Sequence, residues 1–278
     1  MDSRFEENKN VTHVSIDGVE LIQFGNLLKY KKVITHCFTT RHGGVSKNPY
    51  ESLNMAFNKR DERESVEENY RRVAKALGID IWDMVFSNQV HDNKIRVVTE
   101  EDRGKGIIKQ SDIIGFDGLA TNKRKVALVT FYADCVPVFL FDPVKTVISI
   151  VHSGWRGTVK EISKEAVRKM KDTFSCNPKD ILAAIGPSIG SCCFEVGDEV
   201  YEEFEASIGW STKYCERKNG KWYFDLPEII KNSLLNEGVK DENIVLSGIC
   251  TKCNKDLFFS HRGDNGKTGT LAAIMMIN

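Results

Sequence analysis

Runs of apolar residues along the chain predict a protein of mixed α and β structure. Residues 11–24 and 33–39 combine apolar and β-branched side chains, as short strands do. Several later runs are almost uniformly apolar, which is typical of strands in a sheet that is covered on both faces. The strand-like runs after residue 80 lie at 84–91, 94–99, 126–132, 136–141, 146–152, 180–186, 243–249 and 270–277. Such runs need helices to cover them.

Four helices are expected between these strands. Ser65 and Glu68 have the spacing of a capping box and Gly78 follows as a stop, so a helix is predicted over 65–77. Thr158 and Glu161 repeat that spacing. The helix predicted after them keeps its apolar side chains on one face, at Val159, Ile162, Val167, Met170 and Phe174. The other two helices are expected at about 196–206 and 227–237.

The chain carries no sign of division into domains. Its 278 residues contain no repeat and no low-complexity linker. Lys plus Arg equals Asp plus Glu at 39 each, which argues against a global basic surface for nucleic acid or membrane. The first ten residues are polar, so no secretory signal is expected. The longest apolar stretch is interrupted by Asp134 and Pro137, which favours a soluble, cytoplasmic protein with its eight cysteines as reduced thiols.

One turn between a predicted strand and a predicted helix combines an arginine with glycines. The segment VHSGWRGT at 151–158 places Arg156 between Gly154 and Gly157. The first amides of a helix carry partial positive charge, so this turn could bind a phosphate or a carboxylate. A tight connection with a solvated arginine fits the same residues, and the sequence does not decide between the two interpretations.

Two histidines and a cysteine lie in or at the end of apolar runs. His152 follows TVISIV, His91 ends MVFSNQVH, and Cys135 lies in FYADCVPVF beside Asp134. If these strands are neighbours, two imidazoles and a thiolate meet at one end of a sheet, a donor set that suits zinc with one position open. Gln89 would share a strand face with His91. The alternative is three polar residues satisfied separately in the core, because no local spacing brings them together.

The other motifs are less specific. CTKC at 250–253 has metal-ligand spacing, but no second pair of that spacing accompanies it. Adjacent Cys192 and Cys193 are not expected to bind one metal together, and most of these side chains are expected to be buried thiols. The segment RHGGVS at 41–46 again combines an arginine, Arg41, with glycines, and a surface turn is the alternative interpretation.

Seven segments together resemble one protein family along nearly the whole chain. They are FTTRHGGVS (38–46), NQVHDN (88–93), FDGLAT (116–121), ADCVPVFLFDP (133–143), VHSGWRGT (151–158), IGPSIGSCCFEVG (185–197) and FFSHRGDNGKTG (258–269). The family was first described as multicopper polyphenol oxidases, or laccase-domain proteins, and later as zinc-dependent purine nucleoside phosphorylases. The resemblance implies a single α/β/β/α layered domain over residues 1–278 with mixed sheets. It also implies phosphorolysis of adenosine, inosine and methylthioadenosine, and deamination of adenosine.

The resemblance implies a zinc ion, in preference to copper, bound by His91, Cys135 and His152. Purine nucleoside and phosphate are then the expected ligands, and an open zinc position could activate the water that deamination needs. The other site residues expected here are Gln89 and Asp134, which act beside Cys135 in catalysis, and Arg41, Arg156 and Arg262, which bind substrate. Gln89 is expected to position its neighbours, and Asp134 can join the site only where its strand ends or bends.

The sequence departs from the family pattern in two places. Asp92 stands where the family usually has a glycine after the histidine. Near the C-terminus SHRGD replaces the usual SYRRD, and TGT replaces TGR, so two arginines of the pattern are missing. If those arginines hold phosphate or substrate, phosphorolysis is weakened in this chain.

Two other classes of enzyme remain open on the sequence. In a metal-free hydrolase or deamidase, Cys135 would be the nucleophile and His152 its base. A copper-dependent polyphenol oxidase would need many histidines for its copper cluster, and the chain has only six. The sequence gives no indication of the oligomeric state.

Overall fold

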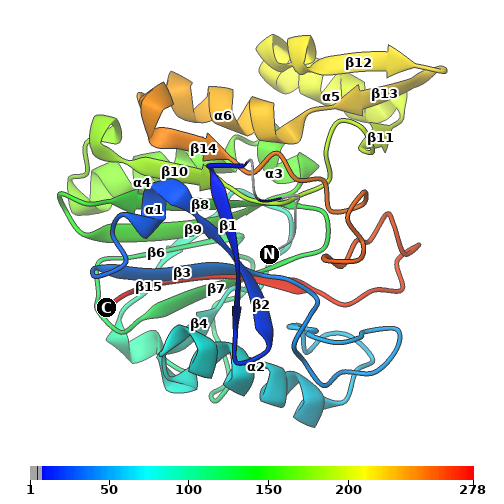
Figure 1. The fold of residues 1–278 in the computed structure, drawn as a ribbon. Helices are drawn as coiled ribbons and strands as arrows, with labels where there is room; N and C mark the ends of the chain where they lie inside the picture. Colours follow the sequence, from blue (N-terminus) through cyan, green and yellow to red (C-terminus); the bar gives the residue numbers. More distant parts are fainter. Residues whose placement is uncertain (1–4, 6–7) are drawn as a thin grey trace.

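A computed structural model describes residue 5 and residues 8–278. Two six-stranded sheets form the centre of the molecule (Figure 1). The first has the order β1-β2-β3-β15-β7-β4. Its strands are β1 Val11–Ile16, β2 Val19–Phe24, β3 Ile34–Thr39, β4 Met84–Phe86, β7 Ala127–Tyr132 and β15 Leu271–Ile277. A tight turn at Asp17 and Gly18, both with positive φ, joins β1 to β2.

The second six-stranded sheet has the order β14-β10-β8-β9-β6-β5. Its strands are β5 Ile95–Val97, β6 Gly118–Thr121, β8 Val136–Asp142, β9 Val147–Ser153, β10 Leu182–Ile185 and β14 Ile244–Leu246. Both large sheets contain parallel and antiparallel pairs, for example parallel β4 with β7 and antiparallel β8 with β9. The mixed α/β class and the mixed sheets predicted from the sequence are therefore confirmed.

Helices cover the outer faces of the two sheets, so the order of layers is α/β/β/α (Figure 1). The helices are α1 Gly25–Leu28, α2 Arg63–Leu77, α3 Trp155–Val159, α4 Ile162–Phe174, α5 Asp198–Ile208 and α6 Leu226–Asn236. Helix α2 buries Tyr70 against the first sheet, and α4 buries Met170 against the second. Phenylalanines such as Phe38 and Phe139 fill the space between the sheets.

A small third sheet was not predicted. It has the order β11-β13-β12, with β11 Glu195–Val196, β12 Cys215–Lys218 and β13 Lys221–Phe224. Helix α5 packs on it through stacked rings, with the centroids of Tyr201 and Trp222 only 3.9 Å apart. The strands have only two to four residues and β12 is largely polar, so the sequence lacks the long apolar run that marks the central strands.

Several local predictions were wrong. The strand expected over 84–91 ends at Phe86, because the amides of residues 90–92 donate to the Asp117 carboxylate rather than to a neighbouring strand. Helix α2 begins at Arg63 with Glu62 as N-cap, so Ser65 lies inside the helix and caps nothing. Its predicted end is confirmed, because Gly78 adopts the left-handed conformation as C-cap.

The second capping box is also absent. Thr158 lies in α3, where its hydroxyl donates to the Gly154 carbonyl at 3.0 Å. The chain then turns at Glu161, which has a φ of 52°, and α4 starts at Ile162. Glu161 pairs with Lys164 instead of capping the helix. The single helix predicted after the 151–158 turn is therefore two helices.

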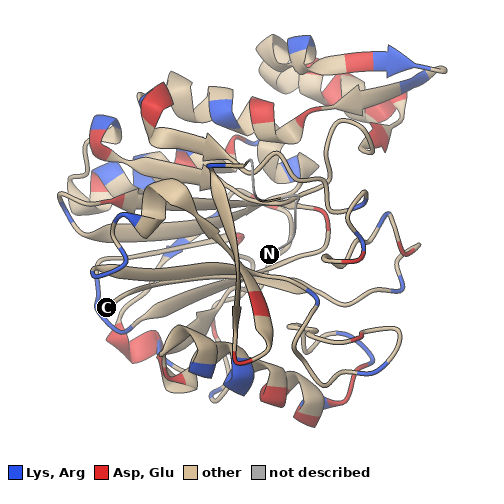
Figure 2. Cartoon of the chain, in the orientation of Figure 1, with Lys and Arg blue, Asp and Glu red and all other residues tan. Residues whose placement is uncertain are grey.

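Charged residues of both signs are interspersed over the helices and loops, while the central strands contain few of them (Figure 2). Among the described residues, no helix has the length and apolarity needed to cross a lipid bilayer. The expected lack of a secretory signal concerns residues 1–10, of which 1–4 and 6–7 lie outside the described residues.

Acidification should destabilise the fold through His36, whose side chain lies between the two sheets. The residue is 2% exposed, and its Nε2 accepts the Phe24 N–H at 2.9 Å, so the ring must be neutral. Burial lowers the pKa of His36 from 6.5 to about 3. Between pH 6.5 and about 3, His36 is therefore protonated in the unfolded chain and neutral in the folded chain. Over this range, each unit by which the pH falls lowers the free energy of unfolding by about 1.4 kcal/mol through this group alone.

Urea unfolding at pH values from 7 to 4 measures this effect. The variant His36→Gln should be less stable at pH 7 but should lose less stability on acidification than the wild type, because one titrating group is gone. Equal pH slopes in the two proteins would contradict the assignment.

Candidate metal centre and its cavity

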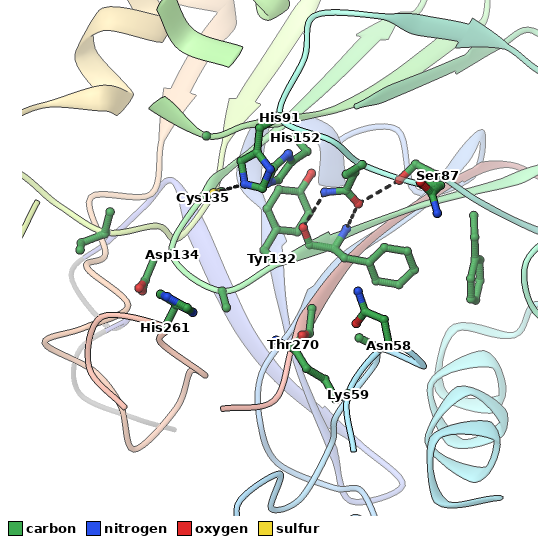
Figure 3. Close-up of a pocket in the computed structure, with 18 of the residues that line it drawn as sticks. Asn58, Lys59, Ser87, His91, Tyr132, Asp134, Cys135, His152, His261 and Thr270 are labelled. Carbon is green, nitrogen blue, oxygen red and sulfur yellow. Dashed lines mark hydrogen bonds between the residues drawn. The ribbon is translucent and has the colours of Figure 1, made fainter. Parts of the chain in front are cut away.

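His91, Cys135 and His152 meet at one end of a cavity (Figure 3). Their ligand atoms all lie within 4.8 Å of one another, and Cys135 Sγ is 3.9 Å from His91 Nε2. The two imidazole rings are nearly perpendicular, with centroids 4.8 Å apart. The convergence that the sequence left open is therefore present in the structure, and the group can hold a metal ion.

The topology of the second sheet explains how residues so far apart in sequence converge. Strands β8 and β9 are antiparallel neighbours with Val136 opposite Ser153, so Cys135, which immediately precedes β8, lies beside the end of β9. His152 is itself the penultimate residue of β9. His91 comes from the loop after β4 of the first sheet and has a φ of 62°. The ligands thus come from both sheets at one end of the sandwich.

A buried carboxylate, Asp117, holds two of the three residues in place. It precedes β6, the other neighbour of β9, and is 0% exposed. Its Oδ1 accepts the N–H of His91 and the Nδ1–H of His152, both at 2.9 Å, and its Oδ2 accepts the N–H groups of Val90 and Asp92. With Nδ1 occupied, His152 has Nε2 left for a metal, as in the carboxylate–histidine pairs that support zinc sites.

The same contacts favour negative charge on Cys135 and Asp117 and positive charge on His152. Burial opposes ionisation of Cys135, but the charge and hydrogen bonds of His152 and His91 lower the pKa of its thiol to about 6. Burial likewise opposes protonation of His152, but Cys135 and Asp117 raise its pKa to about 9. Although burial works against it, the hydrogen bond from His152 also lowers the pKa of Asp117. A thiolate is therefore accessible near neutral pH, and thiolates are the form of cysteine that binds metals.

Gly154 leaves room for the three donors. A Cβ at this position would lie 2.9 Å from His91 Cδ2 and 3.0 Å from Cys135 Sγ, closer than side chains tolerate. In a tetrahedral zinc site, a nitrogen and a sulfur ligand lie about 3.6 Å apart, close to the spacing seen here. Among residue 5 and residues 8–278, no fourth ligand joins the two imidazoles and the thiolate, so the group fits a metal ion with one open position.

The cavity beside this group has a volume of about 670 Å³. The aromatic part of its lining comprises Phe57, Phe86, Phe131, Tyr132, Trp155 and Phe194. Polar side chains also line the cavity, including Asn58, Lys59, Asn88, Ser111, His261 and Arg262. Figure 3 shows Asn58 and Lys59 across the cavity from the His91, Cys135 and His152 side chains. This volume and the mixed lining suit a ligand with a flat ring and a polar part.

Gln89 and Asp134, both expected in the site, line the cavity. Gln89 locks the 87–91 loop to β7, because its Oε1 accepts the Phe131 N–H at 2.8 Å and its Nε2 donates to the Phe131 carbonyl. Asp134 has a φ of 87° at the bend between β7 and β8, which lets it join the site beside Cys135. Its carboxylate accepts hydrogen bonds from the Thr251 hydroxyl and the Arg262 N–H, both at 2.7 Å.

The three arginines expected to bind substrate are not brought together. Arg262 lines the cavity, stacks on Phe194 and donates one guanidinium hydrogen bond to the Glu195 carbonyl. Arg41 lies outside the lining and donates to the carbonyls of two loop residues, Glu51 and Lys255. Arg156 is exposed on α3, stacks on Trp155 and also lies outside the lining. The geometry therefore singles out Arg262 as the arginine that faces the cavity.

Sequence reasoning missed Asp117 and His261. The only signal for Asp117 was its place in the segment FDGLAT, because nothing local reveals that it faces His152. His261 lines the cavity where the family pattern has a tyrosine. At the other departure from the pattern, Asp92 pairs with Lys160 at 2.8 Å and so joins the His91 loop to the turn before α4.

Comparisons with known proteins give consistent results. Residues 35–278 match the family described as multi-copper polyphenol oxidoreductase laccase. "Purine nucleoside phosphorylase YlmD" of Bacillus subtilis is 38% identical over 240 residues, 86% of each chain. A "Purine nucleoside phosphorylase" of Bacteroides thetaiotaomicron is 32% identical over 261 residues, covering 93% of this chain and 96% of that protein. The crystal structure of YlmD from Geobacillus stearothermophilus superposes with a TM-score of 0.87 at 35% identity, over 93% of this chain and 96% of that one.

Proposed function

This chain belongs to the multi-copper polyphenol oxidoreductase laccase family, and from that premise we propose that it is a zinc-dependent purine nucleoside phosphorylase. The proposed substrates are adenosine, inosine and methylthioadenosine together with phosphate, and deamination of adenosine is proposed as a second activity. One observation carries the proposal: the group of His91, Cys135 and His152 opens on a cavity large enough for a nucleoside. The names of the relatives from Bacillus subtilis and Bacteroides thetaiotaomicron support it. We further propose one domain over residues 1–278, because the two large sheets share a core.

The residues present fit a zinc ion, which His91, Cys135 and His152 would hold. When bound, zinc supplies a Lewis acid that stabilises negative charge developing on the reacting groups. Asp117 fixes the tautomer of His152 and the position of the His91 loop, so both imidazoles are held ready before substrate arrives. Gln89 holds the same loop against β7 from the other side.

Phosphorolysis forms a bond between a phosphate oxygen and the anomeric carbon of the sugar while the bond to the purine nitrogen breaks. The purine leaves with the bonding electrons and takes a proton. The aromatic side chains that line the cavity, such as Phe131 and Phe194, provide flat apolar walls for the purine. Arg262 and Lys59 line the cavity and would provide positive charge for phosphate.

The histidines other than His91 and His152 are not arranged to bind the several copper ions that a multicopper oxidase needs. His13 pairs with Glu20, His36 is buried against Phe24, and His42 contacts the Asp256 carbonyl. Within the described part of the chain, these three rings are therefore engaged elsewhere, and His261 is the one further histidine that lines the cavity. A mononuclear site of two histidines and one cysteine is the arrangement that the side chains support.

A metal-free Cys/His hydrolase is the second candidate, because Cys135, His152 and Asp117 also have the order of a catalytic triad. The His152 Nδ1 to Asp117 Oδ1 distance of 2.9 Å orients the ring as such a triad requires. His91 has no role in that mechanism, whereas its contact with Cys135 is explained by a shared metal. This observation favours the zinc enzyme.

Product analysis tests the proposed activity. Purified protein of known zinc content is incubated with adenosine, inosine and methylthioadenosine, each with and without phosphate. Phosphorolysis predicts release of the free purine with an equal amount of sugar 1-phosphate, and only when phosphate is present. Inosine accumulating from adenosine without phosphate identifies deamination. Intact nucleosides under all conditions, with zinc bound, would refute the assignment.

A further inference from the structure

A second group of cysteines lies on two loops beside the cavity. Cys192 and Cys193 are on the loop between β10 and β11, and Cys250 and Cys253 are on the loop that follows β14. All four Sγ atoms lie within 4.8 Å of one another. Cys253 Sγ is 3.6 Å from Cys192 Sγ and 3.5 Å from Cys193 Sγ. The expectation that most of these cysteines are buried thiols was wrong, because Cys192 and Cys253 are exposed and Cys193 and Cys250 are only half-buried. The second pair that CTKC lacked in the sequence is provided by Cys192 and Cys193.

We propose that Cys192, Cys193, Cys250 and Cys253 bind a structural zinc ion that clamps these two loops together. Structural zinc sites have four protein ligands in a tetrahedron and no open position, in contrast to the three-ligand site at the cavity. With zinc–sulfur distances of about 2.3 Å, the sulfurs of such a tetrahedron lie about 3.8 Å apart. The separations of 3.5 and 3.6 Å, and the limit of 4.8 Å on the others, match this arrangement.

The surroundings of the four sulfurs are those of a metal–thiolate site. The Gly190 N–H points at Cys250 Sγ, with an N to S distance of 3.3 Å, and peptide N–H groups commonly support metal ligands in this way. A Cβ on Gly190 would lie 3.4 Å from Cys192 Sγ and 3.3 Å from Cys250 Cβ, so the backbone approaches the sulfurs tightly. Hydrophobic packing does not explain why the four thiols cluster, because the side chains of Cys192 and Cys253 remain exposed.

The clamp would support one wall of the cavity. The two loops are joined by the Thr251 N–H, which donates to the Ser188 carbonyl at 2.9 Å. Both loops also contact Asp134, which lines the cavity. The Thr251 hydroxyl donates to its carboxylate, and the N–H of Ile189, the residue after Ser188, donates to its carbonyl. Residue 251 lies between the two cysteines of CTKC, so a metal bound there fixes a direct partner of Asp134.

Metal analysis of purified variants tests the proposal. Wild-type protein should contain two zinc ions per chain, and the double variant Cys250→Ser, Cys253→Ser should lose one of them. Cys215→Ser is the matched control, because Cys215 is a half-buried thiol on β12 outside the cluster, and it should retain both ions. The double variant should also melt about 5–10 °C lower. Unchanged zinc content in the double variant, or iron in place of zinc in the wild type, would overturn the assignment.

Alkylation gives a second test. It uses the wild-type protein, so its result does not depend on whether a variant folds. Bound zinc should protect all four cysteines from iodoacetamide, and a strong chelator should make the exposed Cys192 and Cys253 reactive, as located by peptide mass spectrometry. Rapid alkylation without chelator, or disulfides among the four that a reductant opens, would contradict a zinc site. Neither measurement uses catalytic activity, so both outcomes are independent of the proposed phosphorolysis.

Discussion

Replacing Cys135 with alanine is expected to remove one zinc ion per chain and to lower the rate of phosphorolysis by at least about 100-fold. Cys135 provides the only sulfur in the three-residue group, and its Sγ lies 3.9 Å from His91 Nε2. Without it, two imidazoles remain, which is one protein ligand fewer than catalytic zinc sites have. Zinc per chain and the initial rate of purine release are measured on the same preparation.

Cys215→Ala serves as the control for a lost thiol, because Cys215 is half-buried on β12 and does not line the cavity. It should keep both the zinc content and the rate of the wild type. If Cys135→Ala instead keeps the zinc content of the wild type and loses only activity, its sulfur is not a zinc ligand, and a nucleophilic role for Cys135 becomes the better description.

Replacing Asp117 with asparagine should weaken zinc binding at the same site by about 10–100-fold, although Asp117 is not a ligand. Its carboxylate accepts hydrogen bonds from the His152 ring and from three consecutive backbone amides, including that of His91. An amide in place of the carboxylate presents N–H groups where only acceptors fit, so the His91 loop and the His152 ring both lose their fixed positions. Competition with a chromophoric chelator measures the change in affinity.

Asp142→Asn is the matched control. Asp142 is also 0% exposed and also accepts two backbone amides, those of Val144 and Lys145, but it lies at the far end of β8 from Cys135. Both variants should lose stability, and only Asp117→Asn should lose zinc affinity. Equal zinc affinity in the two variants would show that Asp117 supports the fold alone.

The central strands were predictable because burial leaves a strong sequence pattern. The runs that became β8 and β9 are buried at every position, and both were located to within a residue or so. Strands β11 to β13 were not predicted because each has only two to four residues, too few for a recognisable apolar run. The predicted strand over 84–91 was too long for a different reason: the amides of residues 90–92 bind a distant carboxylate, which no local pattern reports.

For the candidate site, the sequence indicated which residue types could bind a metal but not whether they meet in space. The chemistry of His91, Cys135 and His152 suggested zinc, but their convergence depends on strand order, which spacing does not encode. Asp117 and the four-cysteine group depend equally on contacts between distant segments. For Arg41 the residue type was misleading. Its glycine-rich loop suggested that Arg41 binds an anion, but its guanidinium donates to the backbone carbonyls of Glu51 and Lys255.

The most direct measurement is activity as a function of zinc bound at His91, Cys135 and His152. Protein is stripped of metal with a chelator, zinc is returned in steps, and phosphate-dependent release of hypoxanthine from inosine is followed. The rate should be negligible in the stripped protein and should rise with zinc until the cavity site is filled. Full activity in the stripped protein would contradict a zinc-dependent phosphorylase.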